Sequence, residues 1–281
     1  MKKTILFAAS IAAASLASPV MAQDSGKTYF DGVYVGGTFG LDAMDDNAND
    51  RLVFDTDGDG DFDDNVRTVT NIDAFSPGFC NGQANGATRT AGCRDDKSDF
   101  GYAVRIGFDK RLGDGPIVAG LLVEGAMSDS VEYTSGFSTT PASYTLASKL
   151  DKSVAVRGRL GFSPGNGQGL FYVTGGVAYG DIEHEFTTTN TANSFDVVGD
   201  DKWRLGGQIG GGAELMLTDN ISWGLEYLYS RYDDDKASVL VGPGTAGATN
   251  PFLLDAGQTN LASADSNFDI HSIRTSLSFR F

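Results

Sequence analysis

The run SIRTSLSFRF, Ser272–Phe281, alternates apolar side chains with small or charged ones. Ile273, Leu277 and Phe279 share one set of positions, whereas the other set holds serines and Arg274. A period of two places successive side chains on opposite faces of a β-strand, while a helix would repeat every 3.6 residues. A tilted strand crosses a bilayer in about 9–11 residues. The run therefore predicts a membrane-crossing strand.

Seven further segments repeat this alternation. Eight such strands predict a closed barrel, because in lipid every backbone N–H and C=O must be paired within the sheet. The expected fold is all-β, an eight-stranded antiparallel transmembrane β-barrel with short periplasmic turns and long external loops. The other seven segments are residues 33–41, 100–109, 117–128, 153–162, 171–179, 203–215 and 222–230.

The connections between the runs alternate in length. Short connections contain turn residues such as Gly113-Asp114-Gly115-Pro116. This order is typical of transmembrane barrels and places both chain ends in the periplasm. An extra hairpin in the last long connection, at Ala237–Val241, would raise the strand count to ten. The long connections are residues 43–97, 129–150, 182–201 and 233–267, and the short ones are 111–116, 163–169 and 218–220.

Charged residues fall on the same face of the strands as the glycines. A membrane barrel turns its apolar face to lipid and its charged face to the lumen, whereas a soluble barrel of the lipocalin type would bury the apolar face. Asp109, Lys202 and Arg280 share the charged face. The residues that we expect in the lumen are Arg105, Glu124, Arg157, Arg159, Arg204, Glu214, Glu226 and Arg274.

These lumen charges allow two interpretations. In the first, arginines and glutamates pair across the interior and plug it, because an eight-stranded barrel is just wide enough for side chains to fill. In the second, the same residues line a narrow water path and set its ion preference. The sequence does not assign the pairing partners.

The beginning of the chain predicts a secretory signal peptide at residues 1–22. Lys2 and Lys3 precede an apolar stretch, Ile5–Leu16, and Val20-Met21-Ala22 offers a cleavage site before Gln23. Residues 23–281 would then form one outer-membrane barrel domain. The formal charge is −16, and losing the two lysines makes it −18. So acidic a chain argues against nucleic acid as a partner.

Several of these segments together resemble a known family. They are LFYVTGGVAYG at Leu170–Gly180, the turn Asp219-Asn220 that leads into Glu226–Tyr229, and the terminal Phe281. The chain is similar here to the opacity-type outer-membrane β-barrel proteins, the small surface-antigen porins of Gram-negative bacteria. The resemblance covers the strands but not the long loops.

The resemblance implies both a location and partners. It implies insertion into the cell outer membrane by the barrel-assembly machinery, which reads the aromatic C-terminus, here Phe281. Outer-membrane lipid and lipopolysaccharide would then surround the barrel. Family members serve in structural support, antigenic display, adhesion and weak pore activity.

The first long loop carries aspartates at alternate positions around Gly58 and Gly60. Ca²⁺ takes 6–8 oxygen ligands around such a turn. An EF-hand needs Glu at its twelfth position, where this chain has Val66, so the run is closer to the aspartate repeats of thrombospondin type-3 modules. We expect calcium ligands here; the alternative is a solvated acidic loop. The candidate ligands are Asp55, Asp57, Asp59, Asp61 and Asp63.

Cys80 and Cys93 lie in the same loop and are the two cysteines of the chain. In an oxidising compartment such a pair predicts a disulfide that orders the loop. A redox-active pair is the alternative.

Catalysis has little support in the sequence. The two histidines are His184, expected in a loop between Glu183 and Glu185, and His271 at the start of the last strand. A solvated loop histidine is the expected state of His184; a rim catalytic site or a metal site with its two glutamates is the alternative. We therefore expect a non-enzymatic barrel that supports the envelope and displays its loops, with a plugged lumen. The alternatives are a porin for small solutes and a calcium-ordered adhesin with an extracellular ligand.

Overall fold

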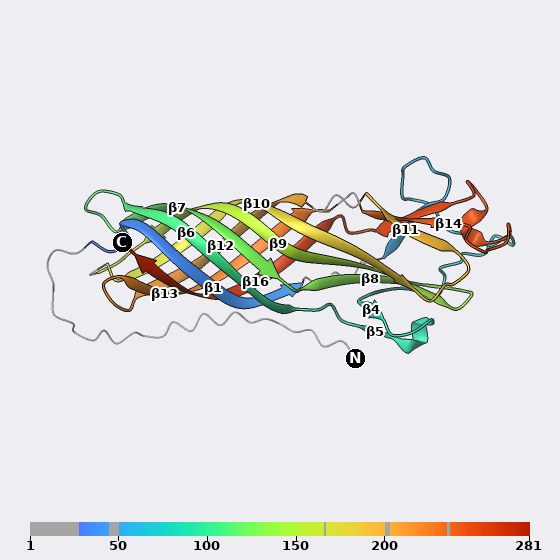
Figure 1. Ribbon diagram of the computed structural model, residues 1–281, viewed down its shortest axis with the longest axis horizontal. Helices are drawn as coiled ribbons and strands as arrows, with labels where there is room; N and C mark the ends of the chain where they lie inside the picture. The colour runs from blue at the N-terminus through green and yellow to red at the C-terminus, as the bar shows by residue number, and fades with distance from the viewer. Residues whose placement is uncertain (1–27, 45–50, 166, 200–202, 235–236) are drawn as a thin grey trace.

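Eight antiparallel strands form a closed barrel in the computed structural model, which describes residues 28–44, 51–165, 167–199, 203–234 and 237–281. The expected signal peptide, residues 1–22, lies outside the described residues. Each barrel strand pairs with the next, and β1 pairs with β16 to close the ring (Figure 1). The predicted fold is confirmed. The barrel strands are β1 (Gly32–Met44), β6 (Asp99–Arg111), β7 (Ile117–Ser128), β9 (Ala142–Phe162), β10 (Gly169–Thr188), β12 (Trp203–Met216), β13 (Ile221–Asp233) and β16 (Asn267–Arg280).

The barrel wall follows the alternation of the sequence. On β6, Val104 and Ile106 are 67% and 53% exposed, while Ala103 and Arg105 between them are buried. An apolar outer surface and a polar interior suit a barrel that is solvated by lipid. The short connections lie at the end of the barrel that carries the C-terminus, which we call the turn end (Figure 1). The opposite end is the loop end.

Two barrel strands continue well beyond the wall at the loop end. The expectation of loops at 129–150 and 182–201 is wrong over much of their length, because β9 already begins at Ala142 and β10 runs to Thr188. Their pairing shifts register between Asp181 and Ile182, a bulge that lets the hairpin bend without ending. The extension also pairs with β8 (Val131–Ser138), which in turn pairs with β3 (Gly78–Asn81).

A second, four-stranded sheet lies over this extension. Its order is β11-β14-β15-β2, so it joins segments from three different long connections. The expected strand at Ala237–Val241 exists as β14, but it belongs to this sheet, so the barrel keeps eight strands rather than ten. The bounds are β11 (Ser194–Val198), β14 (Ser238–Gly242), β15 (Thr259–Ser263) and β2 (Leu52–Asp55).

The two sheets enclose a hydrophobic core of their own. We call this unit the external sandwich: the four-stranded sheet, β3, β8 and the parts of β9 and β10 beyond the barrel. Phe75 sits centrally, with its ring centroid 4.5 Å from Phe54 and 5.2 Å from Tyr144. The external connections are therefore a folded unit and not separate loops. Its buried residues are Leu52, Phe54, Val66, Ala74, Phe75, Ala142, Tyr144, Leu146, Val239, Val241, Phe252 and Leu261.

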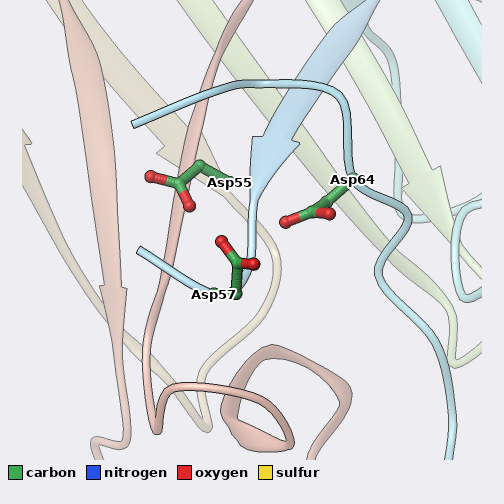
Figure 2. A group of neighbouring side chains, drawn as sticks. All are labelled: Asp55, Asp57 and Asp64. Carbon is green, nitrogen blue, oxygen red and sulfur yellow. The ribbon is translucent and has the colours of Figure 1, made fainter. Parts of the chain in front are cut away.

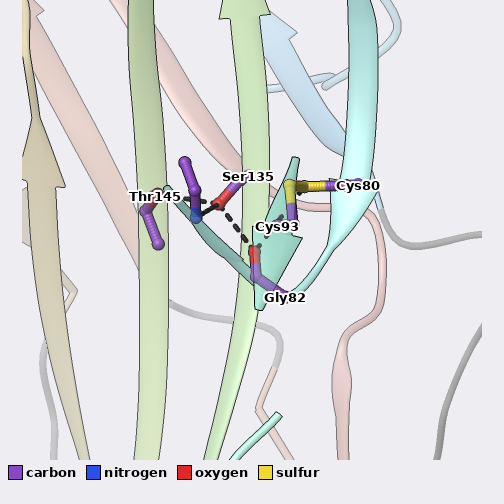
Figure 3. Close-up of a disulfide and its surroundings, with 6 residues drawn as sticks. Cys80, Gly82, Cys93, Ser135 and Thr145 are labelled. Atoms are coloured by element: carbon purple, nitrogen blue, oxygen red, sulfur yellow. Dashed lines mark hydrogen bonds between the residues drawn. A yellow bond between two sulfur atoms is a disulfide. The ribbon is translucent and has the colours of Figure 1, made fainter. Parts of the chain in front are cut away.

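The predicted disulfide between Cys80 and Cys93 is confirmed (Figure 3). It ties β3 to β5, which forms a small hairpin with β4. Ser135 on β8 fixes the same region, because its hydroxyl donates to the Gly82 carbonyl at 2.7 Å and lies 2.7 Å from the Thr145 hydroxyl. The remaining elements are β4 (Gln83–Ala84), η1 (Arg89–Ala91), β5 (Cys93–Arg94) and η2 (Pro251–Leu253).

We expect the Cys80→Ser, Cys93→Ser double variant to lose about 3 kcal/mol of sandwich stability, the chain-entropy value for closing a loop of this length. The barrel should be unaffected, because neither cysteine packs in its interior. Proteolysis at Arg89 in increasing urea would measure the change, with wild-type protein treated with reductant as the matched sample. Equal resistance in the oxidised, reduced and variant proteins would contradict a stabilising role.

Candidate functional site in the barrel interior and the external sandwich

The barrel interior contains five arginines and five carboxylates, each at most 6% exposed. The strand alternation points all of them inward, and their formal charges cancel. Burying an ion is costly unless it is paired, so this balance is what allows so many charges inside a narrow barrel. The residues are Arg105, Arg157, Arg159, Arg274, Arg280, Asp42, Asp109, Glu124, Glu214 and Glu226.

One group of these charges forms a chain across the lumen. Glu124 on β7 accepts from Arg157 at 2.9 Å and from Arg274 at 3.2 Å. Arg274 also reaches Asp42 at 3.2 Å, and Arg157 reaches Glu226 at 3.1 Å. The chain thus connects β1, β16, β7, β9 and β13. We call it the Glu124 chain.

A second group forms a closed ring nearer the turn end, which we call the Arg280 ring. Arg280 contacts Glu214 at 2.6 Å and Asp109 at 2.8 Å. Arg159 contacts Glu214 at 3.0 Å and also pairs with Asp109. The Tyr34 ring lies against both guanidinium groups, with centroid distances of 4.7 Å to Arg159 and 4.6 Å to Arg280. Each carboxylate therefore has two arginine partners.

Arg105 differs from the other interior arginines. Among the described residues, none of its three guanidinium nitrogens has a hydrogen-bond partner, and the carboxylate of Glu226 lies 3.8 Å away. The guanidinium group also lies 6.0 Å from the centroid of the Tyr34 ring, so charge and packing hold it there.

Two clusters of buried apolar side chains lie in the barrel interior, one toward each end of it. Between the Glu124 chain and the loop-end cluster lies a cavity of about 10 Å³, which is room for about one water molecule. The loop-end cluster is Leu150, Ala155, Ala178, Ile182, Tyr232, Phe268 and Ile270, and the turn-end cluster is Phe30, Val118, Leu170, Tyr172 and Met216.

Three interior charges were not among the residues expected in the lumen, and one expected residue, Arg204, belongs to neither interior group. Asp42 directly follows the first alternating run, so continuing that run by one residue identifies it. Asp109 and Arg280 lie within their runs on the charged face, so their positions alone place them in the lumen.

Arg204 lies apart from both interior groups, at the loop end. It contacts Asp234 at 3.1 Å, and Asp234 contacts Nε2 of His184 at 2.8 Å. The His184 side chain is 1% exposed, so the expectation of a solvated loop histidine is wrong. The reason is that β10 continues past Ile182 and turns His184 under the external sandwich.

The acidic loop brings three carboxylates together, those of Asp55, Asp57 and Asp64, with ligand oxygens within 4.8 Å of one another (Figure 2). Asp64 was not among the predicted ligands. It lies near Asp55 because its backbone forms an antiparallel β-bridge with Phe54, the residue before Asp55. The predicted ligands Asp59, Asp61 and Asp63 are instead exposed and lie outside this group.

Hydrogen bonds within the loop fix two of these carboxylates. Asp55 accepts from the backbone N–H of Gly58 at 2.7 Å, and Asp64 accepts from that of Thr56 at 2.8 Å. The Thr56 bonds lower the pKa of Asp64 against a smaller effect of burial. The pKa of Asp57 is raised: the Asp59 backbone N–H lowers it, but desolvation and the surrounding carboxylates outweigh that bond. The loop thus concentrates negative charge at one point.

Phe281 is exposed at the turn end. Its ring lies 5.0 Å from that of Phe279, and its backbone N–H donates to the Val33 carbonyl at 3.0 Å. The terminal aromatic residue is therefore accessible on the outside of the wall.

Comparison with known proteins gives consistent matches. The family profile described as outer membrane protein beta-barrel domain matches residues 9–281. The 31 kDa outer-membrane immunogenic proteins of Brucella melitensis and Brucella suis are each 25% identical to this chain over 193 residues, which is 65% of this chain and 66% of theirs, just under two thirds.

Two solved structures are also similar. The outer membrane protein OprG from Pseudomonas aeruginosa has a TM-score of 0.47 and 13% identity, covering 90% of this chain and 99% of that one. Neisserial surface protein A has a TM-score of 0.35 and 9% identity, covering 89% and 98%. The profile match includes every barrel strand.

Proposed function

Because the chain belongs to the outer-membrane protein β-barrel family and lies in the outer membrane, we propose that it is a sealed barrel that anchors and displays the external sandwich. In this proposal the protein is not an enzyme and not a diffusion pore. The external sandwich would carry out the protein's function outside the cell, and the barrel would attach it rigidly to the envelope.

The observation that carries this proposal is the filled interior. Nine of the ten buried charges pair across the lumen in the Glu124 chain and the Arg280 ring, and an apolar cluster lies at each end. A porin keeps an aqueous channel, whereas this packing leaves room for about one water molecule beside Arg274.

We expect no reproducible single-channel openings from the refolded mature protein in a planar lipid bilayer, because in this proposal the paired charges and the two apolar clusters fill the lumen. Insertion would be checked by heat-modifiable gel mobility, so that a bilayer without openings is not mistaken for a bilayer without inserted protein. Reproducible openings whose conductance changes in Glu124→Gln would instead identify a porin.

We further propose the partners that an outer-membrane barrel requires. Lipid and lipopolysaccharide would cover the apolar wall, and the barrel-assembly machinery would engage the exposed Phe281. The apolar side chains that face outward support the first of these, and the accessible terminal ring supports the second.

A second candidate function is a calcium-ordered adhesin. It is supported by the group Asp55, Asp57 and Asp64, whose ligand oxygens lie within 4.8 Å of one another. A calcium ion would neutralise this crowding and fix the loop against β2.

For this candidate, millimolar calcium should slow tryptic cleavage at Arg51 and Arg67, because external calcium loops bind at about 10⁻⁴–10⁻³ M. Asp64→Asn should abolish the protection, while Asp61→Asn, an exposed aspartate outside the group, should retain it. Magnesium at the same concentration controls for ionic strength. Cleavage that calcium leaves unchanged would remove the candidate.

A further inference from the structure

A pocket of about 280 Å³ opens at the outermost end of the external sandwich. Four segments form it: the chain at Ala74-Phe75, the turn between β8 and β9 with the start of β9, the chain after β10 and the start of η2. Figure 1 shows these elements at the end of the molecule opposite the C-terminus. Small-molecule sites start at about 300 Å³, so the pocket suits a small ligand.

The floor of this pocket is aromatic. Phe75, Tyr144 and Phe252 form a triangle of rings whose centroids are 5.2, 5.6 and 5.9 Å apart. All three are buried in the sandwich core, so they line the pocket as fixed side chains. Such a floor attracts an apolar ligand surface.

The rim of the pocket is polar but uncharged. Of the described residues that line it, none is Asp, Glu, Lys, Arg or His, whereas a fifth of the chain is charged and its formal charge is −16. Thr140 and Thr191 are exposed on the rim, and hydroxyl groups both donate and accept hydrogen bonds. The lining polar residues are Ser138, Thr139, Thr140, Tyr144, Thr189, Asn190, Thr191 and Asn250.

The walls of the pocket are fixed before any ligand arrives. The Asn190 amide donates to the Tyr144 hydroxyl at 3.0 Å, and the Asn250 side chain accepts from the Phe252 backbone N–H at 3.0 Å. Asn193 joins the two walls, because it accepts from both asparagine amides at 3.0 Å. A preorganised site loses less conformational freedom on binding.

We propose that this pocket binds a neutral saccharide unit. A sugar ring has apolar C–H faces for the aromatic floor and hydroxyl groups for the threonine and asparagine rim. An anionic ligand would find no positive partner in the pocket and would be repelled by the acidic chain. A cationic ligand would find no carboxylate in the lining. The assignment rests on the proposed display function and gives the external sandwich a ligand class.

The test is saturation-transfer NMR on the full chain in detergent micelles. The probes are glucose, galactose and N-acetylglucosamine, with cationic glucosamine and anionic glucuronic acid as charged counterparts of similar shape. Thr140→Glu adds a charge at the exposed rim and should weaken neutral-sugar binding about tenfold, or 1.4 kcal/mol. Thr70→Glu changes an exposed threonine away from the pocket and should leave binding unchanged.

Binding of a neutral sugar that Thr140→Glu weakens and Thr70→Glu does not would support the proposal. No signal from any neutral sugar at millimolar concentration would overturn it. Preference for a charged sugar, or equal binding by both variants, would also overturn the proposal. Displacement of the sugar by a proline-containing peptide that binds better would overturn it too. The bilayer recording and the sugar-binding test are independent of each other. Open channels would refute the sealed barrel but would not bear on the pocket, and absent sugar binding would refute the pocket proposal but would not bear on the sealed barrel.

Discussion

The Glu124→Gln protein should be less stable than the wild type by about 3–5 kcal/mol, the typical effect of removing one member of a buried ion pair. Glu124 is 2% exposed and accepts from both Arg157 and Arg274. The amide keeps the size of the side chain but leaves two buried guanidinium groups with one negative partner fewer. Urea unfolding of protein refolded in lipid vesicles would measure the change.

Two further variants make this result specific to the charge. Glu185→Gln removes an exposed glutamate on β10 and should stay within about 0.5 kcal/mol of the wild type. Adding Arg274→Gln to Glu124→Gln restores equal numbers of interior charges, so the double variant should recover part of the loss, with a coupling of about 0.5–3 kcal/mol. A Glu124→Gln protein as stable as Glu185→Gln would mean that the Glu124 chain does not hold the interior together.

Phe75→Ala should destabilise the external sandwich by about 3–5 kcal/mol while the barrel keeps its wild-type stability. Phe75 is 3% exposed, and its ring lies within 6.0 Å of four other aromatic rings. Truncation removes the contacts with these four rings and leaves a cavity among them. The buried clusters inside the barrel do not include it, so the two units should respond separately.

Two readouts separate the units. Trypsin should cleave the sandwich segments of Phe75→Ala at lower urea than in the wild type, while the heat-modifiable mobility of the barrel persists. Ile72→Ala, an exposed position three residues away, is the control and should leave both readouts unchanged. If Phe75→Ala instead lowers the unfolding temperature of the barrel as well, the sandwich and the barrel are one cooperative unit. If neither readout changes, the sandwich core does not depend on Phe75.

The barrel was predictable because its strands are long and its two faces differ throughout. On β16 the alternation around Arg274 fixes both the strand and the inward face, and it does so without knowledge of the neighbouring strands. The Cys80–Cys93 bond was predictable for a similar reason, since only one pairing exists. Both inferences use information that is local in the sequence.

The external sandwich was not predictable in the same way. Its strands are four to eight residues long outside the β9–β10 extension, and β11 pairs with β14 some forty residues later. A short apolar run such as Val239–Val241 predicts a strand but does not show which strand it pairs with. The acidic loop shows the same limit: only the bridge between Phe54 and Asp64 determines that Asp64, and not Asp63, joins Asp55.

The Arg280 ring constrains the order in which the protein can fold. Its members come from β6, β9, β12 and β16, and the contact between Arg280 and Asp109 joins positions 171 residues apart. Contacts so distant in sequence form late, because a long loop must close first. Before β16 joins the barrel, Asp109 and Glu214 have Arg159 as a ring partner but not Arg280. The last strand therefore completes the charge pairing of the interior in the same step in which it seals the wall.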